Sequence, residues 1–389
     1  MSRSLFRFAF VSSCTDFWGG SEELWAGAAH IFAAAGHRVR AFKTNVDRRA
    51  KQVIKLESAN CPVEDLQGLP PKPLRLINRF LPHDRQHLHK NYAQKSLDKA
   101  LRSFQPDLTV VSQGINFDGA YLAEVCRRRK LPYVVVAQKA VDFLFPADEE
   151  RASVRAVYEA AVKCFFVSRH NLNLTEEQIG AALPNAEIVF NPYAAPFENL
   201  LSWNDAGSGK IRLACVARLF IIDKGQDILL RVLAQEKWKK RELEVVFYGE
   251  GVNKQALAEM VRLLEVRNVK FAGYVADVEQ IWKESHALVL PSRSEGLPLA
   301  LVEAMLYGRP SIVTRVGGMA EVVADNVTGF IAAAPTAEAF DEALERAWAQ
   351  RRDWRQIGMR AADSIRKIVP PDPCRRFADK LAELTKELN

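Results

Sequence analysis

The sequence predicts an α/β protein made of two consecutive units, each a parallel β-sheet with helices on both faces. Through the first half, short runs of β-branched and aromatic residues alternate with stretches of helical periodicity, which is the pattern of βα units. A polar stretch at 191–210 follows, with two prolines and a Gly-Ser-Gly cluster, and the alternation then begins again. We therefore place the boundary between the units in this stretch.

The first unit, residues 1–195, is expected to contain strands separated by helices. Its first helix has apolar residues at helical spacing, including Leu24, Ala28 and Ile31, and it ends before Gly36. The strands are predicted at 6–12, 39–43, 108–112, 133–137 and 164–167, and the helices at 21–35, 120–130 and 152–161.

The second unit, residues 196–370, repeats the same alternation. Its sheet is again expected to be parallel, because each predicted strand is followed by a helix or a long connection. A last helix, at about 371–389, is expected to cross back and pack on the first unit. The strands are predicted at 211–216, 243–248, 269–271 and 287–290, and the helices at 227–236, 253–266 and 337–348.

The composition is that of an ordinary globular protein. Of 389 residues, 48% are hydrophobic and 26% are charged, which excludes disordered, collagen-like and fibrous classes. The six cysteines are far apart and form no C-x-x-C motif, so neither a zinc site nor a disulfide framework is expected. No apolar run approaches the roughly 18 residues of a membrane span, and Arg7 interrupts the N-terminal apolar run. A cytoplasmic protein is expected.

The positive charge is concentrated in the first half. Residues 1–195 hold 26 Lys and Arg against 20 Asp and Glu, and the segment at 72–90 mixes cations with apolar residues. One interpretation is a patch that contacts an anionic membrane surface, and the other is a helix with a solvated basic face. Nucleic acid is not an expected partner. His83, His87 and His89 lack supporting Cys or carboxylate spacing, so we expect no metal.

The segment from Pro291 to Met305 carries the strongest chemical signal. It follows a predicted strand and opens a helix near Leu299, and parallel sheets bind ligands at this edge. A helix N-terminus offers unsatisfied N–H groups and a positive dipole end, which suit a phosphate. Glu295 and Glu303 can accept hydrogen bonds from hydroxyl groups, and a vicinal diol such as a ribose suits such a carboxylate.

Other predicted strands also end in residues that could contact a diphosphate. Arg218 and Lys224 place two cations on one loop, where they can neutralise a diphosphate. Gly249 and the pair at 317–318 bring glycines to further strand ends. Each feature alone has an ordinary explanation, as a surface charge or a turn. Their occurrence at successive strand ends predicts a site for a nucleoside diphosphate.

The stretch 218–321 resembles the retaining, nucleotide-sugar-dependent glycosyltransferases of family 4. The resemblance rests on the Glu-x7-Glu pair at Glu295 and Glu303, the sequences Glu-Gly-Leu-Pro-Leu and Glu-Ala-Met, and Gly-Gly-x-x-Glu at 317–321. It implies the GT-B architecture of two facing Rossmann-like domains, the first for the acceptor and the second for the nucleotide sugar.

The resemblance also implies roles for matching residues. Glu303 would bind the ribose, Glu295 would face the transferred sugar, and Tyr274 would border the base. Arg218 and Lys224 would stabilise the departing diphosphate, so that with Glu295 they form the expected catalytic set. The chain contains no Asp-x-Asp, so we expect fixed cations rather than a metal to serve the diphosphate, and no cofactor beyond the donor. The sugar and phosphates would be lined by the backbone of Gly296, Leu297, Pro298, Leu299 and Ala300.

The first unit offers weaker candidates. Gly19 and Gly20 follow the first strand, where the resemblance implies a loop that approaches the diphosphate, although a plain tight turn would also use them. Gln113 and Gln138 end two strands at places where the family often has a histidine. A glutamine cannot act as a base, so these residues would bind hydroxyls of the sugar or the acceptor. A front-face substitution, in which the leaving phosphate helps to take the acceptor proton, tolerates this change.

The predicted function is metal-independent transfer of a hexose-type sugar from a nucleotide diphosphate sugar, with UDP favoured, to a hydroxyl of a glycan or lipid-linked acceptor. The resemblance places it in polysaccharide or envelope glycan synthesis, in the cytoplasm or peripherally at the inner face of the plasma membrane. The alternatives are an epimerase or phosphorylase of the same fold, and a non-catalytic nucleotide-sugar sensor. A nicotinamide oxidoreductase is disfavoured, because no Gly-x-Gly-x-x-Gly follows the first strand.

Overall fold

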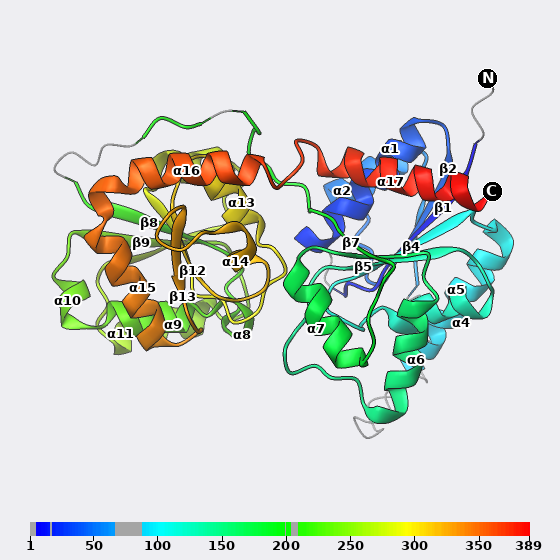
Figure 1. Ribbon diagram of the computed structural model, residues 1–389, viewed down its shortest axis with the longest axis horizontal. Helices are drawn as coiled ribbons and strands as arrows, with labels where there is room; N and C mark the ends of the chain where they lie inside the picture. Colours follow the sequence, from blue (N-terminus) through cyan, green and yellow to red (C-terminus); the bar gives the residue numbers. More distant parts are fainter. Residues whose placement is uncertain (1–4, 16–17, 67–87, 199, 204–208) are drawn as a thin grey trace. The chain divides into compact units, whose positions relative to one another are not determined.

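The computed structural model of the chain describes residues 5–15, 18–66, 88–198, 200–203 and 209–389. These residues form two compact units, each with its own sheet and helices (Figure 1). Met1–Pro192 and Asp372–Asn389 belong to the first unit, and Tyr193–Pro371 forms the second. The chain therefore passes between the units twice, after Pro192 and after Pro371.

The described residues of the first unit form a parallel sheet of seven strands in the order β3-β2-β1-β4-β5-β6-β7. All residues of β5 are buried, because helices cover both faces of the sheet. The strand order changes direction between β1 and β4, so the loops after these strands flank a preferred place for ligands. The strands are β1 (Arg7–Ser12), β2 (Arg38–Lys43), β3 (Val63–Asp65), β4 (Leu108–Gln113), β5 (Tyr133–Ala137), β6 (Lys163–Phe166) and β7 (Ala186–Ile188).

Helices cover the two faces of this sheet with separate cores. Phe8 and Phe10 of β1 pack toward α1, α2 and α17, whereas Ala9 and Val11 point to the opposite face and pack toward α4, α5 and α6. The helices are η1 (Gly20–Glu22), α1 (Glu23–Ala34), α2 (Lys51–Ser58), α4 (Leu88–Phe104), α5 (Ala120–Arg128), α6 (Asp148–Glu159), α7 (Arg169–Ile179) and α17 (Pro373–Leu388).

The C-terminal helix α17 belongs to the first unit and lies beside α1 (Figure 1). Asp372 accepts a hydrogen bond from the backbone N–H of Arg375 at 2.9 Å, and Pro373 occupies the first turn, so the helix start is well capped. Phe377 packs edge-on against Phe165 of the sheet, with ring centroids 5.2 Å apart. The prediction that the last helix packs on the first unit is therefore confirmed.

In the second unit the described residues form a parallel sheet of six strands in the order β10-β9-β8-β11-β12-β13. Here the strand order changes direction between β8 and β11, so the loops after these two strands flank the preferred ligand position. The prediction of two parallel α/β sheets is confirmed. The strands are β8 (Ile211–Val216), β9 (Leu243–Tyr248), β10 (Val269–Gly273), β11 (Ala287–Leu290), β12 (Ser311–Thr314) and β13 (Gly329–Ala332).

The helices of the second unit differ from the prediction in more than one place, since those at 278–284 and 354–366 were not predicted. The expected helix at 227–236 is two helices, because Gln235 has extended backbone angles and turns the chain. Trp238 then donates its indole N–H to Asp341 at 2.6 Å, which holds α10 against α15. The helices are α8 (Ile221–Lys224), α9 (Gln226–Leu233), α10 (Glu236–Lys239), α11 (Lys254–Leu263), α12 (Val278–Glu284), α13 (Leu299–Leu306), α14 (Met319–Val322), α15 (Ala337–Ala349), η3 (Arg351–Asp353) and α16 (Trp354–Arg366).

None of the described helices combines the length and the apolar character that a membrane span requires. The basic segment at 72–90, with His83 and His87, lies mostly outside the described residues. The structure therefore does not test either interpretation of this segment, as a membrane contact or as a helix with a solvated basic face.

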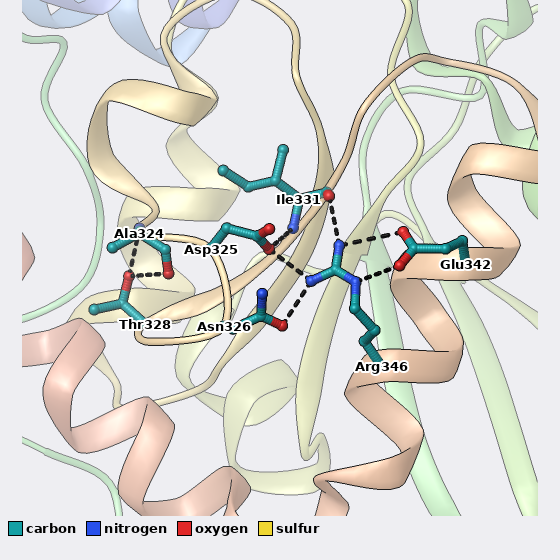
Figure 2. A network of polar contacts seen from close by, with 7 residues as sticks. All are labelled: Ala324, Asp325, Asn326, Thr328, Ile331, Glu342 and Arg346. Carbon is teal, nitrogen blue, oxygen red and sulfur yellow. Dashed lines mark hydrogen bonds and ion pairs between the residues drawn. The ribbon is translucent and has the colours of Figure 1, made fainter.

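Arg346 of α15 holds the turn that leads into β13 (Figure 2). Its guanidinium donates to Asp325 at 2.9 Å, to Asn326 at 2.6 Å and to the backbone oxygen of Ile331 at 2.9 Å. Glu342, one turn away on the same helix, accepts from its Nε at 2.6 Å. A planar guanidinium can donate to all these partners at once, whereas an ammonium group cannot reproduce this arrangement of donors.

We expect Arg346→Lys to lower the free energy of unfolding of the second unit by about 1–2 kcal/mol, because several charge-assisted hydrogen bonds are lost while the charge is kept. Urea unfolding of the full chain measures the change. The control is Arg355→Lys, at an exposed position of α16, which should stay within about 0.5 kcal/mol. Equal losses in the two variants would contradict a structural role for the network.

Candidate functional site

The loops that follow β8, β9, β11 and β12 are hydrogen-bonded to one another at the carboxyl edge of the second sheet. The Leu219 N–H donates to Glu250 O at 3.0 Å, joining the loops after β8 and β9. The Arg293 N–H donates to Asp223 O at 2.7 Å, joining the loops after β8 and β11. These bonds build a connected edge around the point where the strand order changes direction.

Lys224 and Glu295, two of the predicted catalytic residues, form an ion pair across this edge. The ammonium Nζ lies 2.8 Å from each carboxylate oxygen of Glu295, and Ser292 Oγ donates to Oε1 at 2.8 Å. The side chains are 17% and 7% exposed, so both charges are largely removed from water. A buried pair of this kind is stable because each charge has a partner.

A second ion pair, between the loop after β11 and the start of α9, was not predicted from the sequence. Arg293 binds Asp227 with two parallel hydrogen bonds of 2.6 and 2.8 Å, and it also donates to Ile221 O at 2.9 Å. Burial alone would raise the pKa of Asp227, but hydrogen bonds from Arg293 and Arg231 bring it below its usual range. Arg293 lies inside the recognised Pro291–Met305 segment, but its partner is 66 residues away.

Two glycines make the close contact of these loops possible. Gly225 has φ +61°, and a Cβ there would lie 2.0 Å from Pro291 O. Gly317 has φ +55°, and a Cβ there would lie 2.3 Å from Glu295 O. Any larger residue would push the loops apart and strain the backbone.

Three other predicted donor-site residues lie on the neighbouring loops. Arg218 is exposed after β8, and its backbone oxygen accepts a hydrogen bond from Gln226 Nε2 at 2.8 Å. Gly249 directly follows β9 and donates its N–H to Gly273 O at 2.7 Å. Tyr274 is 78% exposed after β10, the edge strand, and is therefore the most peripheral of the three.

Glu303 lies in α13 and is only 6% exposed. Its Oε1 accepts a hydrogen bond of 3.0 Å from the backbone N–H of Ala194, and burial raises the pKa of its carboxyl to about 7. Gly296, Leu297 and Pro298 lead into this helix, and Leu299 and Ala300 form its start. The first N–H groups of a helix have no acceptor within it, so this end can bind an anion.

In the first unit, Gly19 and Gly20 lie at the start of η1, in the loop after β1. A buried ion pair that sequence reasoning missed supports this loop. Lys43 Nζ lies 3.2 Å from Glu22 Oε2 and donates to Cys14 O at 2.7 Å. Burial raises the pKa of Glu22, and the opposing effect of Lys43 is smaller.

Gln113 and Gln138, the predicted hydroxyl-binding residues, are buried at the ends of β4 and β5. The amide oxygen of Gln113 accepts from Tyr158 Oη at 2.6 Å, and that of Gln138 accepts from Asn191 Nδ2 at 2.6 Å. Within the described part of the chain, neither amide nitrogen has a hydrogen-bond acceptor. Each residue thus has a buried N–H donor without an acceptor in the described part of the chain.

No group of three or more His, Cys, Asp or Glu side chains in the described ranges could hold a metal ion. His83 and His87 lie outside these ranges, and the side chain of His89 is not described either.

Residues 210–350 match the family described as glycosyl transferases group 1. Glycogen synthase of Pseudomonas syringae pv. syringae is 28% identical over 145 residues, which are 37% of this chain and 30% of that protein. The D-rhamnosyltransferase WbpZ of Pseudomonas aeruginosa is 29% identical over 150 residues, 37% of this chain and 38% of that protein. The match thus spans about a third of the length of these relatives.

The fold of the whole chain is also found in solved structures. The crystal structure of HepE from Anabaena in complex with UDP-glucose has a TM-score of 0.73 and 16% identity, over 97% of this chain and 99% of that one. At this identity the likeness shows the fold, which is GT-B. In sequence, residues 210–350 are thus similar to the group 1 glycosyltransferases, and the whole chain has the GT-B fold.

The raised pKa of Glu303 predicts that the free energy of unfolding depends on pH. Its pKa is about 7 in the folded chain and 4.5 as the ordinary value, so between these values the folded state binds the proton more tightly than the unfolded state. Stability from this group is therefore fully present below pH 4.5 and is lost as pH rises through 7. Relative to Glu303→Gln, the wild type should lose up to about 3 kcal/mol of unfolding free energy from pH 4.5 to 8.

Urea unfolding across this pH range checks the prediction. The matched control is Glu338→Gln, at an exposed position of α15, which should stay within about 0.5 kcal/mol of the wild type. Parallel pH profiles for wild type and Glu303→Gln would show that the Glu303 carboxyl is not perturbed by burial.

Proposed function

We propose that this protein is a retaining glycosyltransferase that moves a hexose-type sugar from a nucleotide diphosphate sugar to a hydroxyl group. The observation that carries the proposal is the Lys224–Glu295 ion pair between the loops after β8 and β11, which flank the point where the strand order changes direction. The helix α13, which carries Glu303, follows the second of these loops. A UDP-sugar is the favoured donor, since HepE is solved with UDP-glucose.

In the proposed reaction, the bond between the anomeric carbon of the sugar and the diphosphate oxygen breaks. The acceptor oxygen bonds to the same face of that carbon, and its proton passes to the leaving phosphate. Arg218, Lys224 and the N-terminus of α13 would stabilise the charge that develops on the diphosphate. Lys224 is held by Glu295 before the reaction, so little reorganisation of this cation would be needed.

The two carboxylates would bind different hydroxyl groups. Glu303 would accept hydrogen bonds from the ribose, and Glu295 from the transferred sugar. Because Glu295 also holds Lys224, it would set the position of the cation next to the diphosphate. Gly296 to Ala300 would line the phosphates and sugar through their backbone, and Gly249 and Tyr274 would contact the nucleotide.

For the first unit we propose that Gly19 and Gly20 contact the donor and that Gln113 and Gln138 donate hydrogen bonds to hydroxyls through their amide nitrogens. The proposed acceptor is a hydroxyl of a glycan or of a lipid-linked molecule, and we place the protein in the cytoplasm or peripherally at the inner face of the plasma membrane. A peripheral membrane contact would be made through the basic first unit.

The deciding experiment measures binding and products in the presence of EDTA. UDP, GDP, ADP and their sugars are screened by thermal shift, and UDP and a UDP-hexose are expected to stabilise the protein. Turnover with an acceptor panel should then release free UDP and a new glycoside. An altered nucleotide sugar without acceptor would indicate an epimerase, and binding without turnover would indicate a sensor. Stabilisation by none of the nucleotides would contradict the donor site.

Lys224→Ala should lower turnover by roughly 100-fold or more, the scale for losing one preorganised charge stabiliser. Steady-state kinetics with saturating donor measure the change. Lys283→Ala is the matched control, because Lys283 also pairs with a glutamate of the second unit but is 51% exposed on α12. Similar rates in the two variants would rule out the proposed role of Lys224.

Glu303→Ala should weaken UDP binding by roughly 10- to 100-fold, since hydrogen bonds to a charged group contribute about 1.5–3 kcal/mol. Isothermal titration calorimetry measures the affinity, and Glu338→Ala on α15 is the control. Unchanged affinity in Glu303→Ala would place the ribose elsewhere.

A further inference from the structure

The two places where the chain enters and leaves the second unit are joined by one hydrogen bond. Tyr193 is the first residue of this unit, and its Oη donates to the backbone oxygen of Pro370 at 2.7 Å. Pro370 directly precedes Pro371, the last residue of the unit. The Tyr193 hydroxyl therefore fixes the start of the incoming segment to the end of the outgoing one.

The same incoming segment contacts the proposed ribose ligand. The backbone N–H of Ala194, next to Tyr193, donates to Glu303 Oε1 at 3.0 Å. Among the described residues, it is the one hydrogen-bond donor recorded for this carboxylate. The orientation of a buried carboxylate with so few partners depends strongly on that donor.

Arg366 gives the incoming segment a second attachment to α13. Its Nε donates to Phe197 O at 2.7 Å, and its NH2 group donates to Leu306 O at 3.2 Å. Leu306 is the last residue of α13, the helix that carries Glu303. The segment 193–197 is thus attached to α13 near the carboxylate and again at the helix end.

We propose that Tyr193 is a positioning residue for the donor site. By fixing the incoming segment, its hydroxyl keeps the Ala194 N–H on Glu303 Oε1 and leaves the other carboxylate oxygen to accept the ribose hydroxyls. Donor affinity then depends on the attachment of this segment, and by linkage a bound donor tightens the attachment. The inference rests on the proposed ribose-binding role of Glu303.

A double-mutant cycle tests the coupling in the full-length protein. UDP affinity is measured by isothermal titration calorimetry for wild type, Tyr193→Phe, Glu303→Ala and the double variant. Tyr193→Phe should weaken UDP binding by about 3- to 10-fold, the range for one neutral hydrogen bond. In the Glu303→Ala background the same change should have less than about a twofold effect, because the carboxylate that Tyr193 positions is absent.

Two further variants separate positioning from general stability. Tyr133→Phe removes a comparable bond in the first unit, from Tyr133 Oη to Val157 O at 2.6 Å, and should leave UDP affinity unchanged. Arg366→Met releases the second attachment and should weaken UDP binding only when Glu303 is present. This variant keeps the test independent of how well Tyr193→Phe folds.

The outcomes separate this inference from the proposed function. Suppose that wild type binds UDP and that Glu303→Ala weakens this binding. If Tyr193→Phe then has no effect, or the same effect in both backgrounds, the positioning role of Tyr193 is overturned while the proposed function stands. If wild type binds no nucleotide, the proposed function fails and the inference fails with it. Loss of the Tyr193→Phe effect in the Glu303→Ala background supports the inference.

Discussion

The buried ion pair between Lys224 and Glu295 is the interaction on which the candidate site depends. It joins the loops after β8 and β11, and only these loops flank the point where the strand order of the second sheet changes direction. Removing two charges from water is unfavourable, and removing one partner would leave the other charge buried and unpaired. The arrangement is stable because Ser292 adds a hydrogen bond to Glu295, and because the Arg293–Asp227 pair joins the loop after β11 to the start of α9. The charges are therefore in place before any ligand binds, which is what electrostatic stabilisation of a leaving group requires.

Backbone packing supports this electrostatic arrangement. Gly225 places its backbone against Pro291 O, and Gly317 does the same against Glu295 O, so the loops touch without side chains between them. At these two positions the glycines bring loop against loop. The charged side chains are consequently held by strand ends and by each other, rather than by long flexible connections.

Much of the fold could be predicted from the sequence, because strands buried on both faces are short, uninterrupted apolar runs. The strands at 133–137, 211–216, 243–248 and 287–290 have the predicted bounds. β12 and β13 were missed because they have four residues each and include Ser311, Thr314 and Gly329, which weaken the apolar pattern. The site was predictable as a set of residue types at strand ends. Its pairings were not, since Arg293–Asp227 and Ala194–Glu303 join residues 66 and 109 positions apart, and nothing in local spacing indicates such contacts.

The two glutamates of one motif occupy opposite environments, as their different proposed roles require. Glu295 has a cation against it, so its charge is balanced within the chain. Glu303 has a backbone N–H against it, and burial raises its pKa to about 7, so its charged form is unfavourable in the protein alone. A diol that donates hydrogen bonds to this carboxylate supplies what the chain does not, and the free energy of binding then offsets the unfavourable burial. A cation beside Glu303, like the one beside Glu295, would stabilise the fold, but it would compete with the diol for the carboxylate oxygens. In the proposed ribose-binding role, the stability given up at Glu303 would be the physical source of its affinity for the ribose hydroxyls.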